Sequence, residues 1–334
     1  MTAPLKEFIW ESGDEALEDR QLRRPAIYVL LVIVVGVLGF NWPVMATGIK
    51  SISPIWMGIF RVSGAAIVVA AIAALSGNLR VPPRRDLPVI ASLAVFRLAA
   101  VFLLVFTALE LVPASRSAVV VWTTSLWTVP IAAVFLGERV SRQRWLGLTL
   151  GVTGVIVLFE PWSLAWDDRD TIVGHALLIL AAIINASTAV HIRGHRWTIT
   201  PLQALPWQLA SATLLLLPLG LALEGWPPID WSPQLAGVVA YQGALASGIA
   251  LWASIVVFRN MATVSANLTL MGVPVVGVVS SILLLDEQVT ATLALGLVFV
   301  VAGVSLNLFS NRGPPPTNKS QHGSQALKTS AIIE

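Results

Sequence analysis

An arginine at position 97 lies deep inside a long apolar stretch, where a charged side chain needs a partner. The stretch begins at Leu87, so a helix would place Arg97 about 15 Å into a hydrocarbon layer about 30 Å thick. A central arginine costs about 2.5–3.5 kcal/mol there unless it faces a wet cavity or a polar group. A guanidinium in such a cavity can bind a carboxylate or phosphate bidentately. Arg97 is therefore a candidate for binding an anionic solute. The alternative is a structural arginine that bonds helix-end carbonyl groups.

A second arginine, Arg61, lies closer to the end of its own apolar stretch. It follows Pro54 by seven residues, so a helix would place it about 10 Å from the membrane surface. At that depth an arginine can extend its long side chain to the lipid headgroups. We expect Arg61 mainly to anchor its helix in this way, with substrate binding as the alternative.

Amides and a proline mark a third candidate region. In Asn41-Trp42-Pro43 the proline cannot donate to the carbonyl group four residues earlier, that of Gly39, and it should kink the helix. Freed backbone groups beside an amide can bind a substrate, as broken helices do in transporters. Asn185 lies at the corresponding place in the second half of the chain. The alternative is that both asparagines form hydrogen bonds between helices.

Tryptophans and amides in later apolar stretches complete the set of candidates. A few polar groups among aromatic side chains suit the binding of a small organic solute. Tryptophan also fills helix packing and membrane interfaces, so packing is the stronger interpretation for each of these residues. The residues are Trp122, Gln242, Trp252 and Asn267.

The composition is that of a membrane protein and excludes several kinds of chemistry. Hydrophobic residues make up 56% of the 334 residues and charged residues 12%, about half the usual charged share. The chain has no Cys, which excludes disulfides and thiol catalysis. The sequence has no phosphate-binding glycine loop, no clustered metal ligands and no nucleic-acid-type basic cluster. No Asp or Glu lies in the middle of an apolar stretch, so a carboxylate proton relay is unsupported. We therefore expect no cofactor, no metal and no nucleic-acid partner.

The apolar stretches predict ten membrane-spanning helices and four parts of the chain. Most of the 21 Lys and Arg residues fall in the tails and in alternate loops, which places both termini in the cytoplasm of a multi-pass inner (plasma) membrane protein. The parts are a cytoplasmic segment 1–24, a five-helix unit 25–160, a second unit 171–310 and a disordered tail 311–334. The predicted spans are 25–47, 54–75, 87–109, 114–136, 144–160, 171–192, 201–222, 234–258, 262–285 and 290–310.

The two units read as copies of one another. Ser53-Pro54, with Arg61 seven residues after the proline, matches Thr200-Pro201, with Gln208 in the place of Arg61, at an offset of 147 residues. Leu136-Gly137-Glu138 matches Leu285-Asp286-Glu287 at an offset of 149. Five spans is an odd number, so the second copy must enter the membrane upside down. Inverted repeats of this kind are typical of transporters.

In these motifs the chain resembles the EamA-type transporters of the drug/metabolite transporter superfamily. The resemblance implies ten helices in two inverted halves, with a central cavity lined by the first, third, fourth, sixth, eighth and ninth. It also implies movement of small metabolites, often amino acids or drugs, commonly outward. Two departures are Ser125, where the proline that matches Pro274 would be expected, and Asp286, where glycine is usual. The resemblance rests on Ser53-Pro54, Arg61, the run 136–141, Gly147, Gly154, Thr200-Pro201, Val273-Pro274-Val275 and Glu287.

The sequence therefore predicts an all-α membrane protein that works as a secondary transporter by alternating access. Its expected partners are a small-molecule substrate and membrane lipids, and the sequence leaves a homodimer open. The alternative is an intramembrane enzyme or a flippase that acts on lipid-linked substrates. Such an enzyme would need acidic or histidine side chains clustered at the membrane surface, and the sequence shows no convincing cluster.

Overall fold

The computed structural model describes residues 24–137, 140–159, 169–195, 197–227, 229–260, 270 and 272–309, and all regular structure within these ranges is helical. Asn267, Glu138, the segment 1–23 and the tail from residue 310 lie outside the described residues. The helices of the first part are α2 (Arg24–Gly48), α3 (Pro54–Leu75), α4 (Leu87–Ser92), η1 (Leu93–Ala100), α5 (Val101–Leu109), α6 (Ala114–Trp122), α7 (Thr124–Leu136) and α8 (Arg142–Phe159). Those of the second part are α9 (Arg169–Gly194), α10 (Pro201–Glu224), α11 (Pro233–Ala240), η2 (Tyr241–Ile249), α12 (Ala250–Asn260), α14 (Gly272–Leu285) and α15 (Ala291–Phe309).

Seven of the described helices are long and apolar enough to cross a membrane, which makes the chain a multi-pass membrane protein. The predicted spans 54–75, 87–109 and 114–136 coincide with three of them. Large apolar side chains such as Ile67, Leu214 and Leu283 are exposed on the surface, as lipid-facing residues are. The seven are Pro25–Gly48, Pro54–Leu75, Leu87–Leu109, Ala114–Leu136, Arg169–Gly194, Pro201–Glu224 and Pro233–Val257, and the shorter apolar helices are Gly272–Leu285 and Ala291–Leu306.

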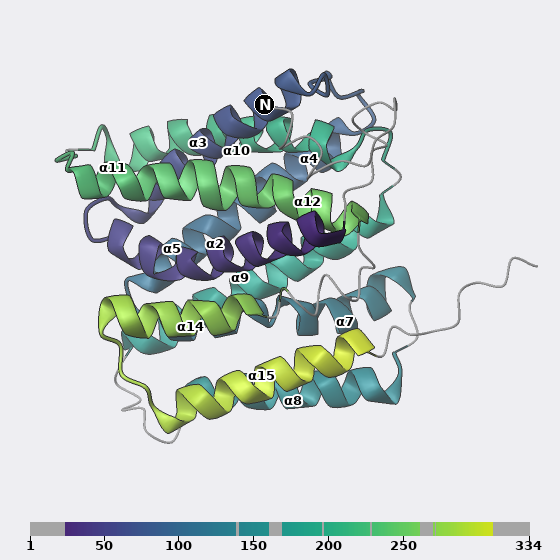
Figure 1. Ribbon diagram of the computed structural model, residues 1–334, viewed down its shortest axis with the longest axis vertical. Helices are drawn as coiled ribbons and strands as arrows, with labels where there is room; N and C mark the ends of the chain where they lie inside the picture. Colours follow the sequence, from purple (N-terminus) through teal and green to yellow (C-terminus); the bar gives the residue numbers. More distant parts are fainter. Residues whose placement is uncertain are drawn as a thin grey trace, which may run out of the picture.

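The helices run across the long axis of the molecule and stack along it. In Figure 1 the pair α3 and α10 lies at the top, α2, α5 and α9 lie in the middle, and α8 and α15 lie together at the bottom. The start of α2 and the end of α15 lie at the same end of the bundle, the right-hand end in this view.

Glycines let several helices approach backbone to backbone. A Cβ atom added to Gly64 of α3 would lie 3.1 Å from the Cα atom of Gly243 in η2, so these helices cross in direct contact. A Cβ atom on Gly303 of α15 would lie 2.6 Å from the carbonyl oxygen of Gly147 and 2.7 Å from the amide nitrogen of Gly151, both in α8. Small residues at helix crossings allow this close packing in membrane proteins.

Two long helices contain π-helical segments in their middle. The helix 87–109 consists of α4, η1 and α5, and the helix 233–260 consists of α11, η2 and α12. The first residues of η1 and η2, Leu93 and Tyr241, are separated by nearly the offset that relates the repeated motifs. π-Helical turns are rare and frequently lie at functional sites. Arg97 lies in η1, and Gln242 lies in η2.

The motif pair that reveals the repeat begins two equivalent helices. The Ser53 side chain accepts a hydrogen bond from the Trp56 amide at the start of α3. At the start of α10 the Thr200 hydroxyl accepts from the Gln203 amide, and the Gln203 side chain accepts from the Thr200 amide. In both cases the capping residue precedes a proline, which suits the first turn because it needs no amide donor there.

Candidate functional site

A cavity of about 430 Å³ lies in the centre of the helices and gathers most of the polar residues that the sequence singles out. Much of the rest of its wall is apolar, with Val101, Phe102 and Val105 on one side and Leu270 and Val273 on another, while Thr124 and Ser125 add hydroxyl groups. The structure thus brings together residues from α2, α3, η1, α6 and α9, and their role in binding stays a prediction. The candidates in the wall are Asn41, Trp42, Arg61, Arg97, Trp122 and Asn185.

Arg97 faces this cavity from the π-helical segment η1. Its side chain is partly buried, and it forms no hydrogen bond or ion pair with any residue that the structure describes. The alternative role, bonding of helix-end carbonyl groups, therefore finds no support among these residues. A partly desolvated guanidinium without a protein partner retains all five N–H donors for another anion or dipole.

Arg61 joins two parts of the chain that are far apart in sequence. Its Nε–H donates to Ser247 Oγ at 2.7 Å, and its Nη1 donates to Gln242 Oε1 at 2.8 Å. Its guanidinium carbon also lies 4.3 Å from the centre of the Phe102 ring, within cation–π range. The side chain is only 7% exposed. The expectation that Arg61 extends to the lipid headgroups is therefore wrong, because buried acceptors on η2 hold its guanidinium inside.

Asn41 lines the cavity and has an unpaired hydrogen-bond acceptor. Its Nδ2 group donates to Met45 Sδ at 2.9 Å, while its Oδ1 atom is buried and has no partner among the described residues. Buried polar atoms are paired in most proteins, so an unpaired one is a reason to look for a ligand. Met45 also accepts from Arg61 Nη1 at 3.2 Å, which connects Asn41 with the arginine.

The remaining sequence candidates lie outside the cavity wall. Gln242 is fully buried behind Arg61 and holds it in place through the hydrogen bond already described. Trp252 packs, with Trp122, against an apolar cluster that includes Leu31 and Val34. Asn267 lies outside the described residues.

Glu287 makes a contact between the two halves that its sequence position does not reveal. Its Oε1 accepts a hydrogen bond from the Ala114 amide at 2.8 Å, and its Oε2 accepts from the Ser115 amide at 3.1 Å. A carboxylate is favourable at the start of a helix, where unpaired amides and the helix dipole meet it. Glu287 therefore ties the end of α14 to the start of α6.

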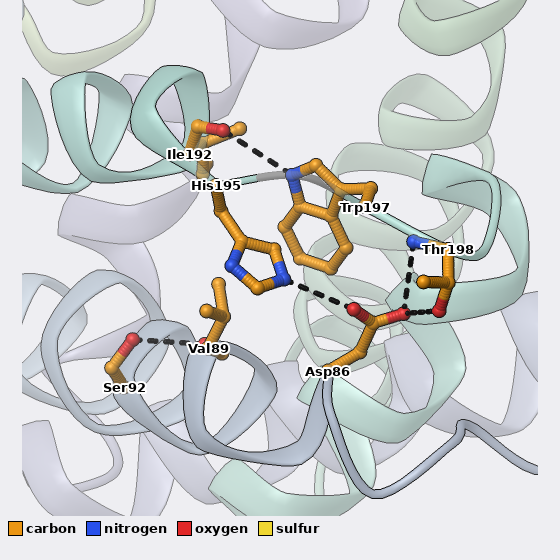
Figure 2. A network of polar contacts seen from close by, with 7 residues as sticks. All are labelled: Asp86, Val89, Ser92, Ile192, His195, Trp197 and Thr198. Carbon is orange, nitrogen blue, oxygen red and sulfur yellow. Dashed lines mark hydrogen bonds and ion pairs between the residues drawn. The ribbon is translucent and has the colours of Figure 1, made fainter.

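A buried carboxylate forms a second polar network at the opposite end of the bundle (Figure 2). Asp86 Oδ1 lies 3.0 Å from His195 Nε2, and Asp86 Oδ2 accepts hydrogen bonds from the amide and the hydroxyl group of Thr198. The Trp197 ring contacts the imidazole edge-on, with ring centres 5.0 Å apart. Burial would raise the pKa of Asp86, but the hydrogen bonds from Thr198 and His195 outweigh it and lower the pKa below its ordinary value.

Sequence reasoning misses this network because each member has an ordinary local explanation. Asp86 precedes Leu87-Pro88 and therefore looks like a residue that caps its own helix. His195 lies in the short connection between α9 and α10. The packing of α9 and α10 against the helix 87–109 brings the two together.

A family model for EamA-like transporters matches the chain twice, over residues 26–160 and 172–309. The chain belongs to the EamA-like transporter family. Both polar networks and the cavity lie within these matched segments, and the long apolar helices agree with the family's membrane location. The protein is therefore a membrane transporter.

Relatives and a solved structure agree with this assignment. The chain is 27% identical to a probable amino-acid metabolite efflux pump of Escherichia coli, over 87% of this chain and 96% of the relative. It is 28% identical to the inner membrane transporter YedA of Escherichia coli, which is uncharacterised, over 85% of this chain and 90% of the relative. A crystal structure with 17% sequence identity superimposes with a TM-score of 0.61, over 84% of this chain and 98% of that one, which shows a shared fold.

Proposed function

We propose that this EamA-family member exports a small solute that carries a carboxylate group, with Arg97 as the group that binds the carboxylate. The observation that carries the proposal is the position of Arg97: it faces a largely apolar cavity and has no partner among the described residues. A guanidinium in such surroundings binds a carboxylate more strongly than in water, because the local dielectric constant is low.

The cavity also suits an ammonium group on the same solute. The unpaired Oδ1 atom of Asn41 can accept a hydrogen bond from it, and the faces of Trp42 and Trp122 offer cation–π contacts. The wall provides apolar surface for the rest of the molecule. A zwitterionic amino acid or a derivative of one combines these features. The efflux pump of Escherichia coli, with its amino-acid metabolites, supports the same class and the outward direction.

Transport by alternating access would require two halves that can move against each other around the cavity. We propose that they are inverted five-helix units with ten spans in all and with both termini in the cytoplasm. The start of α2 and the end of α15 at one end of the bundle support this arrangement. So do Arg80, Arg84 and Arg85, because they make the loop between α3 and α4 basic, as cytoplasmic loops are. Reporter fusions test it: the loop at 225–232 should report an outside location, and a cytoplasmic report would contradict the topology.

The substrate proposal is tested by flux into proteoliposomes that contain the purified protein. A thermal-shift screen of amino acids, nucleosides and cationic drugs first identifies ligands, and flux is then measured for those that bind. Arg97→Gln should reduce flux of a carboxylate-bearing ligand by at least tenfold, because a lost charged hydrogen bond is worth about 1.5–3 kcal/mol.

Arg142→Gln is the matched control, since Arg142 is an exposed arginine in the first turn of α8. It should leave flux unchanged at equal abundance in the liposomes. Undiminished flux through Arg97→Gln would remove the arginine from the site. Chemical conversion of a ligand without its translocation would overturn the transporter mechanism itself.

A further inference from the structure

An aspartate just before the first turn of a helix usually caps that helix, but Asp86 does not. It precedes the first turn of α4, where an aspartate side chain normally accepts from the amides of its own helix. Here the carboxylate forms no such bond, although the position is right for one. Asp86 is also fully buried, and it is the only fully buried carboxylate among the residues that the structure describes. Its oxygen atoms therefore serve another part of the molecule.

That part is the connection between α9 and α10, in the second half of the chain. His195 and Thr198 approach Asp86 from this connection and occupy both of its oxygen atoms (Figure 2). Nearby, Trp207 Nε1 of α10 donates to the carbonyl oxygen of Arg80 at 2.8 Å. The loop before α4 is thus bonded to the second half at two points, both at the end of the bundle where α2 begins. We call Asp86, His195 and Thr198 the latch.

Each side of the latch continues into a helix that reaches the cavity. Arg97 lies eleven residues beyond Asp86 on the helix 87–109, about 16 Å along its axis. Asn185 lies ten residues before His195 on α9, about 15 Å away. Both residues line the cavity. A separation of the latch would therefore move two cavity-bearing helices apart at one end.

We propose that the latch is the inner gate of the transporter: its bonds hold the cytoplasmic end closed, and their rupture opens the cavity to the cytoplasm. The inference rests on the proposed alternating-access function and assigns gating residues to it. A buried carboxylate suits this task because it is stable only while its partners remain in place. Once the halves separate, water hydrates the carboxylate and the imidazole, so the open state is also accessible.

The surrounding charges do not replace the latch. Arg84 and Arg85 precede Asp86 and are exposed, as is Arg193 near the end of α9. Among the described titratable groups that act on Asp86, His195 is the one that contributes a charge interaction. Removal of the Asp86 charge should therefore weaken the closed gate without an immediate substitute.

The test uses a single cysteine in the cavity, since the chain has no cysteine of its own. Ser125→Cys places the thiol in the cavity wall. A membrane-impermeant maleimide then reports access from each side, in inside-out and right-side-out vesicles. Asp86→Asn should raise the labelling rate from the cytoplasmic side about tenfold, the change expected when a hydrogen bond to a charged group is lost. It should lower the rate from the outer side at the same time. Thr198→Val should shift both rates in the same directions by a smaller factor.

Asp170→Asn is the matched control, because Asp170 is an exposed carboxylate in the first turn of α9. It should leave both rates unchanged. An unfolded variant would label faster from both sides, so the reciprocal change separates gating from loss of structure. Unchanged labelling in Asp86→Asn, or an equal rise from both sides, would overturn the gate. Labelling needs no substrate. The labelling test of the gate can therefore fail while the flux experiment succeeds, and the flux experiment can fail while the labelling test succeeds.

Discussion

The two ends of the bundle are closed by equivalent helices with different chemistry. At the latch end the loop before α4 packs on α10 through the Trp207 hydrogen bond, and on the connection before α10 through the buried Asp86. At the other end the loop 225–232 packs on α3 through ring contacts: Trp226 with Trp56, and Trp231 with Phe60, each pair with centres 5.7 Å apart. Phe60 and Trp207 are separated by the repeat offset of 147 residues, so these are matching contacts in the two halves.

The difference shows how one architecture can give its two ends unequal stability. Hydrogen bonds to a buried carboxylate are directional and are lost together when the partners separate. Edge-on aromatic contacts are weaker and tolerate small displacements. An exposed hydrogen bond from Ser53 to Glu224 adds a polar contact at the end with the ring contacts, which we call the aromatic end. We therefore expect the latch end to open as a unit and the aromatic end to yield gradually.

The largest effect is expected where α3 crosses η2. A Cβ atom on Gly243 would lie 3.0 Å from the Cα atom of Gly64, and backbone atoms cannot rotate away. Gly243→Ala should lower the free energy of unfolding by about 2 kcal/mol, the range for overpacking in a tight interface. Thermal unfolding in detergent measures the change. Gly237→Ala is the control, because its added methyl group meets open space; an equal loss in both variants would contradict the close crossing.

The next effect concerns pH at the latch end. Because the pKa of Asp86 is lowered in the folded protein, the latch contributes its full stability at pH values above the ordinary aspartate pKa of about 3.9. This contribution is lost as pH falls through the lowered pKa. Wild type should therefore unfold at a higher temperature than Asp86→Asn at pH 7, and this difference should narrow progressively as pH falls below about 4. A difference that does not narrow as pH falls below about 4 would show that the Asp86 charge is not its cause.

A smaller effect is expected when the aromatic end is weakened. Trp226 is 80% exposed, but it covers Trp56, which is 3% exposed. Trp226→Ala should remove about 1 kcal/mol of edge-on contact and raise maleimide labelling of the cavity cysteine from the outer side about fivefold. Leu223→Ala, an exposed change in the last turn of α10, should have no such effect. Faster labelling from the cytoplasmic side in Trp226→Ala would contradict the assignment of the aromatic end to the outer side of the membrane.

The smallest effect involves Glu110, also at the aromatic end. Burial and the negative charge of Glu224 raise the pKa of Glu110, so its ionised form destabilises the folded protein at pH 7. Both carboxylates are exposed, and Glu110→Gln should therefore stabilise the protein by less than about 0.5 kcal/mol. The difference in stability between Glu110→Gln and wild type should vanish as pH falls through the raised pKa of Glu110. A lower unfolding temperature for Glu110→Gln than for wild type would contradict this prediction.

The sequence predicts what depends on local apolar length and misses what depends on packing. The bounds of α3 and of the helices 87–109 and 114–136 follow from uninterrupted apolar stretches. The same argument locates Arg97 in the middle of its helix, and the structure then places it in the cavity wall. Arg61 is misplaced because depth alone suggests the membrane surface, whereas Ser247 and Gln242 hold it inside. The π-helical segments and the latch have no local signal, since contacts between distant segments create them.

Alternating access requires the two ends of the bundle to open in turn around the cavity. Pairs of spin labels on cysteines can report both ends, one pair at Arg85 and Arg193 and the other at Lys50 and Asp230, because the chain has no native cysteine. Pulsed electron paramagnetic resonance in liposomes would then give the distance distribution of each pair. Alternating access predicts two distance populations for each pair, and Asp86→Asn should lengthen the first distance while it shortens the second. Distances that lengthen together, or a single population unmoved by Asp86→Asn, would contradict it.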